Sequence, residues 1–239
     1  MTATMTMTMT TSTTVKLRLF NYWRSSSSYR VRIALELKNI EYTYVPVNLI
    51  AENGGEHRGE AYRAQNAMAQ VPLLEIDEGD GAPPQRIPQS VAIFEYLEER
   101  FASDARAALL PRDVRARAKV RALVEIVNSG IQPLQNLNVT RRIAELGGDP
   151  KAWAAGFIED GLNAFDALLT EAGSNDKYCI GDTFTLADCC LIPQLHAARR
   201  VDVVTERWPR LAAIEAHSLA HPAFRRAHPD QQPDAPRPA

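Results

Sequence analysis

Four consecutive serines, residues 25–28, stand ahead of an apolar segment that begins at Val31. Serine is a strong helix N-cap, so this pattern predicts a helix that begins within the serine run. At such a helix end, free backbone N–H groups and aligned peptide dipoles stabilise a nearby thiolate, and a serine hydroxyl can donate a hydrogen bond to sulfur. The region contains no cysteine, so the thiol would have to arrive on a bound molecule, and glutathione fits that need. Simple helix capping is the commoner role of such serines.

Two further residue pairs could hold an extended ligand. Val71-Pro72 precedes a predicted strand, and a cis peptide bond there would turn the Val71 backbone outward to pair with the ligand, although most X–Pro bonds are trans. Gln89-Ser90 stands at a predicted helix start, where it could bind the ligand's carboxylate. Ser90 could equally be a simple cap.

Other familiar chemistries have no motif in this sequence. It contains no H-E-x-x-H, C-x-x-C, G-x-S-x-G or glycine-rich phosphate loop, so we expect no metal site and no nucleotide or hydrolase chemistry. The formal net charge of -2 and the lack of Lys/Arg runs argue against nucleic acid as a partner. No segment approaches the roughly 20 apolar residues of a membrane span, so we expect no membrane partner.

The cysteines and the first residues favour a cytoplasmic protein. Cys179, Cys189 and Cys190 are odd in number and irregularly spaced, which argues against a disulfide framework. Residues 1–14 are rich in Thr and Met and lack the charged and apolar regions of a secretory signal. We expect these residues to be a disordered extension.

The elements that position these residues fall into two parts of the 239-residue chain. Period-two alternation and turn signals predict strands, and apolar residues at helical spacing predict helices between them. We expect strands at 15–20, 42–47, 73–76 and 86–87, and helices from the serine run to Asn39, at 56–65 and at 90–101. The first two strands flank a helix and should be parallel, while the turn-rich residues 77–84 should join an antiparallel pair. Residues 15–102 therefore predict an α+β domain of order βαβαββα.

Beyond a predicted linker at 103–110, residues 111–228 predict an all-helical domain, followed by a flexible tail at 229–239. Its first helix should carry Pro111 in its first turn and be kinked by Pro133. One face of that helix is apolar, at Val120, Leu123, Val124, Val127, Ile131 and Leu134. Further helices are expected at 151–169, 186–198 and 209–219, the second of them capped by Thr185 and Asp188.

The segment 24–35, with the sequence RSSSSYRVRIAL, resembles the signature of the zeta class of glutathione transferases, which includes maleylacetoacetate isomerases. Segments 70–72, 89–93, 131–137 and 186–194 also resemble that family, so the resemblance covers most of residues 15 to 225. It implies the glutathione transferase architecture, with a thioredoxin-like domain before an all-α domain. It also implies glutathione as the cofactor and a homodimer.

The resemblance assigns roles to individual residues. Ser25 would activate the glutathione sulfur, with Ser26 and Ser27 lining the same loop. His57 stands at a position associated with the ligand, although a solvated loop histidine is an equal alternative. The implied glutathione-binding residues are Ser25, His57, Val71, Pro72, Gln89, Ser90, Gln132 and Asn136.

Two positions depart from the family pattern. Relatives often carry cysteine where this chain has Ser27, and reductive dehalogenases of the family need that cysteine to resolve a mixed disulfide. Dehalogenation is therefore disfavoured. The stretch Asn66-Ala67-Met68 also differs from the more usual Asn-Pro.

The implied reaction is glutathione-dependent cis-trans isomerisation of maleylacetoacetate or maleylpyruvate in the breakdown of aromatic compounds. Such a substrate is a dicarboxylate, for which arginine is a suitable partner. Arg24, beside the serines, and by resemblance Arg200 are the candidates, and Arg199 could exchange roles with Arg200. A surface-paired side chain is the common alternative for each arginine.

Two other functions stay open on the sequence. One is a general glutathione transferase or peroxidase, which would act on electrophilic aromatics more than on maleyl compounds. The other is a transferase-like binding module without catalysis.

Overall fold

The computed structural model describes residues 15–103, 106–172 and 174–237, so the predicted extension at 1–14 lies outside the described residues. One mixed sheet has the strand order β2-β1-β3-β4. Its strands are β1 (Lys16–Asn21), β2 (Thr43–Pro46), β3 (Leu73–Asp77) and β4 (Gln85–Pro88). Strand β1 pairs parallel with β2, and β3 pairs antiparallel with β4, both as predicted. Strand β1 also pairs antiparallel with β3.

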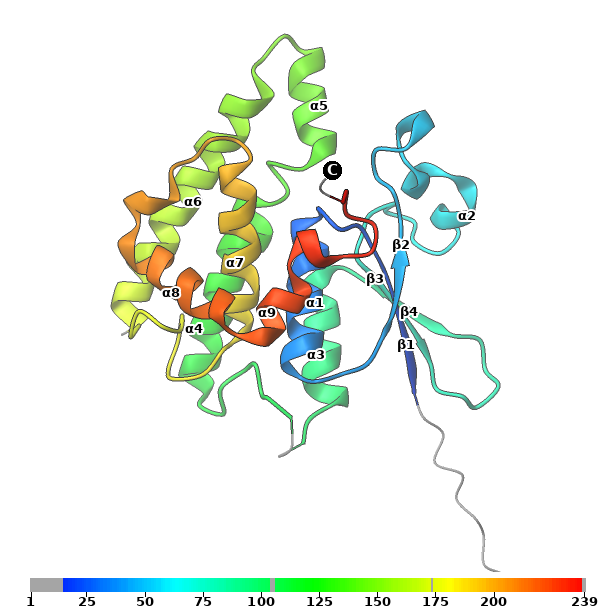
Figure 1. Cartoon of the computed structure of the whole chain (residues 1–239), viewed down its shortest axis with the longest axis horizontal. Helices are drawn as coiled ribbons and strands as arrows, with labels where there is room; N and C mark the ends of the chain where they lie inside the picture. Colours follow the sequence, from blue (N-terminus) through cyan, green and yellow to red (C-terminus); the bar gives the residue numbers. More distant parts are fainter. Residues whose placement is uncertain (1–14, 104–105, 173, 238–239) are drawn as a thin grey trace, which may run out of the picture.

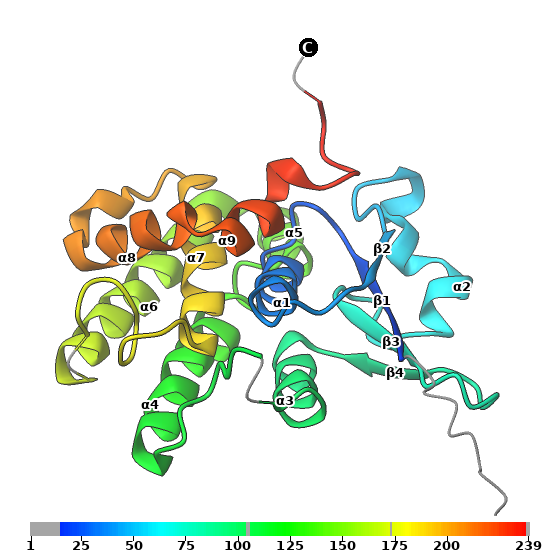
Figure 2. The ribbon, with the colours of Figure 1, turned by 60° about the horizontal axis from the view of Figure 1, so that its bottom comes forward.

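Helices α1 (Ser26–Leu37) and α3 (Ser90–Arg100) lie on one face of the sheet, and the short α2 (Glu60–Arg63) lies on the other (Figures 1 and 2). This gives the predicted βαβαββα order. The expected helix at 56–65 is broken, because Gly59 is extended, with φ -65° and ψ 152°, between a 3-10 turn at Glu56–Arg58 and α2.

The rest of the described chain is helical, with no strand beyond β4 in the described ranges. Its helices are α4 (Val114–Glu125), α5 (Leu137–Glu145), α6 (Pro150–Ala172), α7 (Leu186–Arg199), α8 (Pro209–Ala220) and α9 (Pro222–Ala227). The expected capping of α7 is confirmed, because the Asp188 carboxylate accepts hydrogen bonds from the Thr185 backbone N–H (2.7 Å) and hydroxyl (2.8 Å).

The first helix of this part differs from the prediction at both ends. Pro111 precedes the helix, which is capped instead by Asp113, whose carboxylate accepts from the Arg115 and Ala116 backbone N–H groups at 3.1 and 2.8 Å. At the other end, α4 continues into a π-helical turn at Ile126–Ile131 and stops before Pro133, rather than kinking there. A proline cannot donate the next helical hydrogen bond, so the chain turns away.

Helix α1 lies at the centre of the molecule, and residues 28–35 are all buried. The sheet and α3 cover it on one side, and α7 and α9 cover it on the other (Figure 2). One continuous apolar core therefore runs from Leu19 and Leu74 of the sheet through α1 to Leu191 of α7. A smaller cluster around Phe20 and Tyr62 fills the opposite face of the sheet, as period-two alternation requires.

The end of the chain returns to α1 and β2 (Figure 1). Although a flexible tail was predicted from residue 229, Pro229–Gln231 forms a 3-10 turn. The Asp234 carboxylate then accepts hydrogen bonds from the Trp23 backbone N–H (3.1 Å) and the Tyr44 hydroxyl (2.5 Å). The tail differs from the prediction because these donors lie more than 180 residues away in sequence, where no local pattern records them.

Candidate functional site

A cleft of about 890 Å³ opens between the sheet and the helical part of the chain. All the site residues expected from the sequence line it, although they come from distant segments. They are Arg24, Ser25, Ser26, Ser27, His57, Val71, Pro72, Gln89, Ser90, Gln132, Asn136 and Arg200.

Ser25 is the N-cap of α1, as the serine run predicted. Its Oγ accepts a hydrogen bond from the Ser28 backbone N–H at 3.2 Å, so the hydroxyl hydrogen is left to donate toward the cleft. Ser26 and Ser27 form the first turn of the helix, where backbone N–H groups have no partner within the helix. A thiolate at this end of the cleft would meet a hydroxyl donor, free N–H groups and the positive end of the α1 dipole.

The loop before Ser25 is fixed from behind by the buried side chain of Arg32. Its guanidinium donates at 3.0 Å each to the Asn21 Oδ1, the Trp23 carbonyl and the Ala227 carbonyl of α9. The loop before Ser25 is therefore tied to α9 through the Arg32 side chain.

Ser90 is not the N-cap of α3. Gln89 occupies the cap with φ +73°, a backbone region that non-glycine residues rarely adopt, and Ser90 is the first helical residue. The Ser90 Oγ accepts a hydrogen bond at 3.2 Å from Nη1 of Arg30. Strained backbone of this kind clusters at ligand sites, and here it turns Gln89 and Ser90 toward the cleft.

The Val71–Pro72 peptide bond is cis, and both residues line the cleft at the start of β3. The preceding loop is held by its own side chains. The Tyr62 hydroxyl and the Asn66 amide each donate to the Gln70 carbonyl at 2.7 Å. The loop is thus anchored by the Asn66 side chain, although Ala67 stands where the family resemblance predicts proline.

His57 is buried at the edge of the cleft and is not a solvated loop histidine. Its Nδ1 has no hydrogen-bond partner among the described residues. Burial, followed by the charges of Arg58, Arg141 and Arg63, lowers the pKa of His57. Gly55 is required beside it, because φ is +103° and a Cβ there would lie 2.4 Å from the Leu49 carbonyl oxygen.

The helical part contributes the opposite wall. Gln132 follows the π-helical turn, and Asn136 caps α5 through a 3.1 Å hydrogen bond from the Asn138 backbone N–H to its Oδ1. Gly161 of α6 lets the π-helical turn approach closely, since a Cβ there would lie 2.2 Å from Cγ1 of Ile131.

The described residues that line the cleft include three cations and no carboxylate. The cations are Arg24, Lys151 and Arg200. Nη1 of Arg200 contacts the Arg24 carbonyl at 3.5 Å, and partial burial together with the charge of Arg24 lowers the pKa of Arg200. Arg199 instead forms an ion pair with Glu215 and does not line the cleft. The cleft therefore favours anions, and of the two neighbouring arginines Arg200 faces them.

Comparison with known proteins identifies the two parts of the chain that enclose the cleft. Residues 24–100 match the glutathione S-transferase N-terminal domain, and residues 151–214 match its C-terminal domain. Probable maleylacetoacetate isomerase 2 of Drosophila melanogaster is 48% identical over 219 residues, covering 91% of this chain and 90% of that protein. The chain belongs to the maleylacetoacetate isomerase family of zeta-class glutathione transferases.

Two solved structures resemble this zeta-class transferase closely. Maleylacetoacetate isomerase from Anaeromyxobacter dehalogenans 2CP-1, with bound dicarboxyethyl glutathione and citrate in the active site, has a TM-score of 0.82 and 43% identity, covering 94% of this chain and 96% of that chain. The holo structure of a maleyl pyruvate isomerase, a bacterial zeta-class enzyme, has a TM-score of 0.83 and 40% identity. The match covers 92% of this chain and 100% of that chain.

Some residues of the zeta-class transferase cleft were not expected from the sequence. Lys151 lines the cleft near the start of α6 and forms an ion pair with Asp202, and Asn128 reaches it from the π-helical turn. Neither residue belongs to a local motif. The sequence offered one indication that Arg30 is buried. It stands among apolar residues in α1, a helix without an exposed face.

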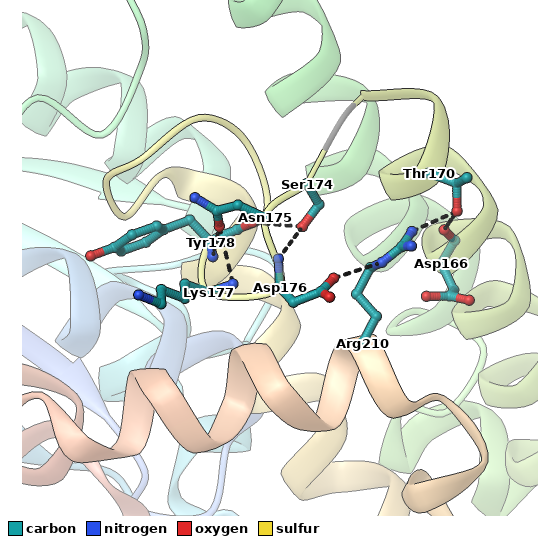
Figure 3. A network of polar contacts seen from close by, with 8 residues as sticks. All are labelled: Asp166, Thr170, Ser174, Asn175, Asp176, Lys177, Tyr178 and Arg210. Atoms are coloured by element: carbon teal, nitrogen blue, oxygen red, sulfur yellow. Dashed lines mark hydrogen bonds and ion pairs between the residues drawn. The ribbon is translucent and has the colours of Figure 1, made fainter.

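The zeta-class transferase has another polar network, in which none of the residues lines the cleft (Figure 3). Arg210 of α8 donates to Oδ1 of Asp176 (3.0 Å) and to the Thr170 hydroxyl (2.6 Å), which fastens the loop before α7. We assign this network a structural role. Among the described residues there is no cluster that could hold a metal ion, and no helix long and apolar enough to cross a membrane.

Proposed function

We propose that this zeta-class transferase catalyses the glutathione-dependent cis-trans isomerisation of a maleyl dicarboxylate, maleylacetoacetate or maleylpyruvate, to its fumaryl isomer. One observation carries the proposal. The cleft joins a thiolate-stabilising helix end at Ser25 to the cations Arg24, Lys151 and Arg200, with no carboxylate among the described lining residues. A bound thiol and a dianionic substrate are the reactants such a cleft accepts.

Glutathione would lie along the sheet side of the cleft. Its cysteine sulfur would meet Ser25, and its backbone would pair with Val71 before β3. Gln89 and Ser90, at the start of α3, would receive the γ-glutamyl end. His57 would contact the remainder from the sheet side, and Gln132 and Asn136 would contact it from the helical wall.

The reaction conserves atoms and electrons. The thiolate adds to one carbon of the cis double bond, whose electron pair moves onto the conjugated carbonyl as an enolate. The former double bond is then single and rotates, and the enolate expels the thiolate to form the trans double bond. Arg24 and Arg200 would hold the substrate carboxylates during rotation, and the positive cleft would stabilise the enolate.

A direct assay tests this proposal. Loss of the maleyl absorbance should require glutathione and should exceed the rate with electrophilic aromatic compounds or peroxides. Faster turnover of aromatics or peroxides would favour a general transferase or peroxidase instead. Failure of the folded protein to bind glutathione would favour a non-catalytic module.

We further propose a cytoplasmic homodimer. Family resemblance supports the dimer, and Cys179, Cys189 and Cys190, which are free and buried, suit a reducing compartment. Light scattering of the purified protein should give twice the 26.5 kDa mass of one chain.

A further inference from the structure

Arg30 lies in the centre of α1 and is completely buried. Its Nη1 donates to two oxygens from different parts of the fold. One is Oγ of Ser90 at the start of α3, at 3.2 Å, and the other is Oδ1 of Asn128 in the π-helical turn, at 3.0 Å. Both Ser90 and Asn128 line the cleft, whereas Arg30 lies behind them.

The Arg30 guanidinium forms no ion pair within the described parts of the chain. Burial lowers the pKa of Arg30, and the charge of Glu125, which is not in ion-pair contact, only partly opposes this. Nε and Nη2 of Arg30 are also buried without hydrogen-bond partners among the described residues. A buried cation without a counter-ion costs several kcal/mol, so such a group is normally retained with an anion nearby. Because Ser90 lies between Arg30 and the cleft, an anion bound at Ser90 would be the nearest available counter-charge for Arg30.

The contact also fixes the direction of the Ser90 hydroxyl. Because Ser90 Oγ accepts from the Arg30 guanidinium, its own hydrogen points elsewhere and can donate toward the cleft. Oδ1 of Asn128 accepts from the same nitrogen, Nη1 of Arg30, and so holds the guanidinium in position behind Ser90. The neighbouring Ser129 does not share this role, since its hydroxyl is bonded to Glu125.

We propose that Arg30 is the buried counter-charge for the α-carboxylate at the γ-glutamyl end of glutathione, with Asn128 holding its guanidinium in place. The inference rests on the proposed glutathione site and names a residue behind it. Arg30 acts through Ser90 and does not touch the cofactor, so Arg30 and Asn128 are positioning residues.

The test compares two ligands by calorimetric titration of the full chain. One ligand is glutathione, and the other is the same tripeptide with 4-aminobutanoate in place of the γ-glutamyl residue, which lacks only that carboxylate. Asn128→Ala should weaken glutathione binding about tenfold, the range of one charge-assisted hydrogen bond, and should change binding of the analogue less than about twofold. Arg30→Met, which removes the charge but keeps a side chain of similar length, should weaken glutathione binding at least as much and should likewise spare the analogue.

The matched control is Asn163→Ala. Asn163 is an amide outside the cleft that accepts from Trp208 Nε1 at 2.9 Å, and its loss should not change the affinity ratio of the two ligands. Equal weakening of both ligands by Asn128→Ala, or no weakening of either, would overturn the role of Arg30. If the wild-type protein fails to bind glutathione, the proposed function fails with it. If it binds and isomerises while the variants keep the wild-type ratio, only the present inference fails.

Discussion

Ser25 and Ser28 show how two serines of one run acquire different roles. Ser25 caps α1 and faces the cleft, whereas Ser28 is buried and its hydroxyl has no partner among the described residues. Of these two serines, Ser25 alone combines a hydroxyl that faces the cleft with the positive end of the helix. We therefore propose that Ser25, and not Ser28, activates the cofactor sulfur.

Ser25→Ala should raise the pKa of bound glutathione's thiol toward that of a free thiol and reduce isomerisation about 10- to 100-fold. The ultraviolet absorbance of the thiolate, titrated in the binary complex, measures this pKa. Ser28→Ala is the control and should leave the thiol pKa unchanged. Full isomerisation with an unshifted thiol pKa in Ser25→Ala would disprove the assignment.

Arg199 and Arg200 form a second matched pair. Arg200→Ala should raise the KM for the maleyl substrate about tenfold while the KM for glutathione stays constant, because only the substrate carboxylate loses its partner. Arg199→Ala should leave both KM values unchanged and lower the free energy of unfolding by about 1–3 kcal/mol, since it leaves the buried Glu215 without its ion pair. Steady-state kinetics and urea unfolding distinguish these outcomes, and interchanged effects would contradict the placement.

At the scale of elements, the π-helical turn after α4 decides what the helical wall offers to the cleft. It presents Asn128 and Ser129 and leads directly into Gln132. Its close contact with α6 depends on the absence of a side chain at Gly161. The geometry of the wall is therefore coupled to one position on a neighbouring helix.

Gly161→Ala should shift the π-helical turn away from α6, weaken glutathione binding and cost about 1–3 kcal/mol of unfolding free energy through overpacking. Gly156→Ala is the control in the same helix, because an added Cβ there meets nothing within 4 Å. That variant should gain about 0.5–1 kcal/mol from helix propensity. Chemical denaturation of both proteins measures the difference, and equal effects would refute the coupling.

In the molecule as a whole, the C-terminal residues pack against the loop that leads to Ser25. Asp234 accepts from the Trp23 backbone and the Tyr44 hydroxyl, and Arg32 joins the same loop to α9. The residues at 229–237 thus act as a brace for the loop that ends at Ser25.

Asp234→Ala should lower kcat about three- to tenfold with little change in the KM for glutathione, because the loop loses a hydrogen bond to a charged group. Asp234→Asn keeps one acceptor oxygen and should recover part of the loss. Wild-type kcat in Asp234→Ala would show that the brace does not matter for turnover.

His196 of α7 packs against His228 at the end of α9, and we expect it to make stability depend on pH. Burial, His228 and Arg200 lower the pKa of His196 to about 4 from the ordinary value of 6.5. The unfolded chain binds the proton more tightly, so stability should be full above pH 6.5 and should fall as the pH drops toward 4, by about 1–3 kcal/mol. Urea unfolding across this pH range should show the slope, and His196→Gln should reduce it.

Much of the fold follows from local pattern. The serine cap of α1, the strand alternation, the Thr185–Asp188 box and the helix starting at Ser90 are visible because capping and periodicity involve neighbours in sequence. The break at Gly59 and the π-helical turn were missed, since local pattern does not record how tightly a segment must pack. The domain division at 103–110 stays a prediction.

Local pattern points to the helix end at Ser25 as the place for a thiol and names the residue types around it. Three placements depend on folding instead: Arg200 rather than Arg199 faces the cleft, Arg30 lies behind Ser90, and Asp234 bonds the loop before Ser25. These contacts join residues 176, 60 and 211 positions apart. Such pairings are fixed by packing of whole elements, because a side chain's partner depends on which helix or tail lies beside it after the chain has folded.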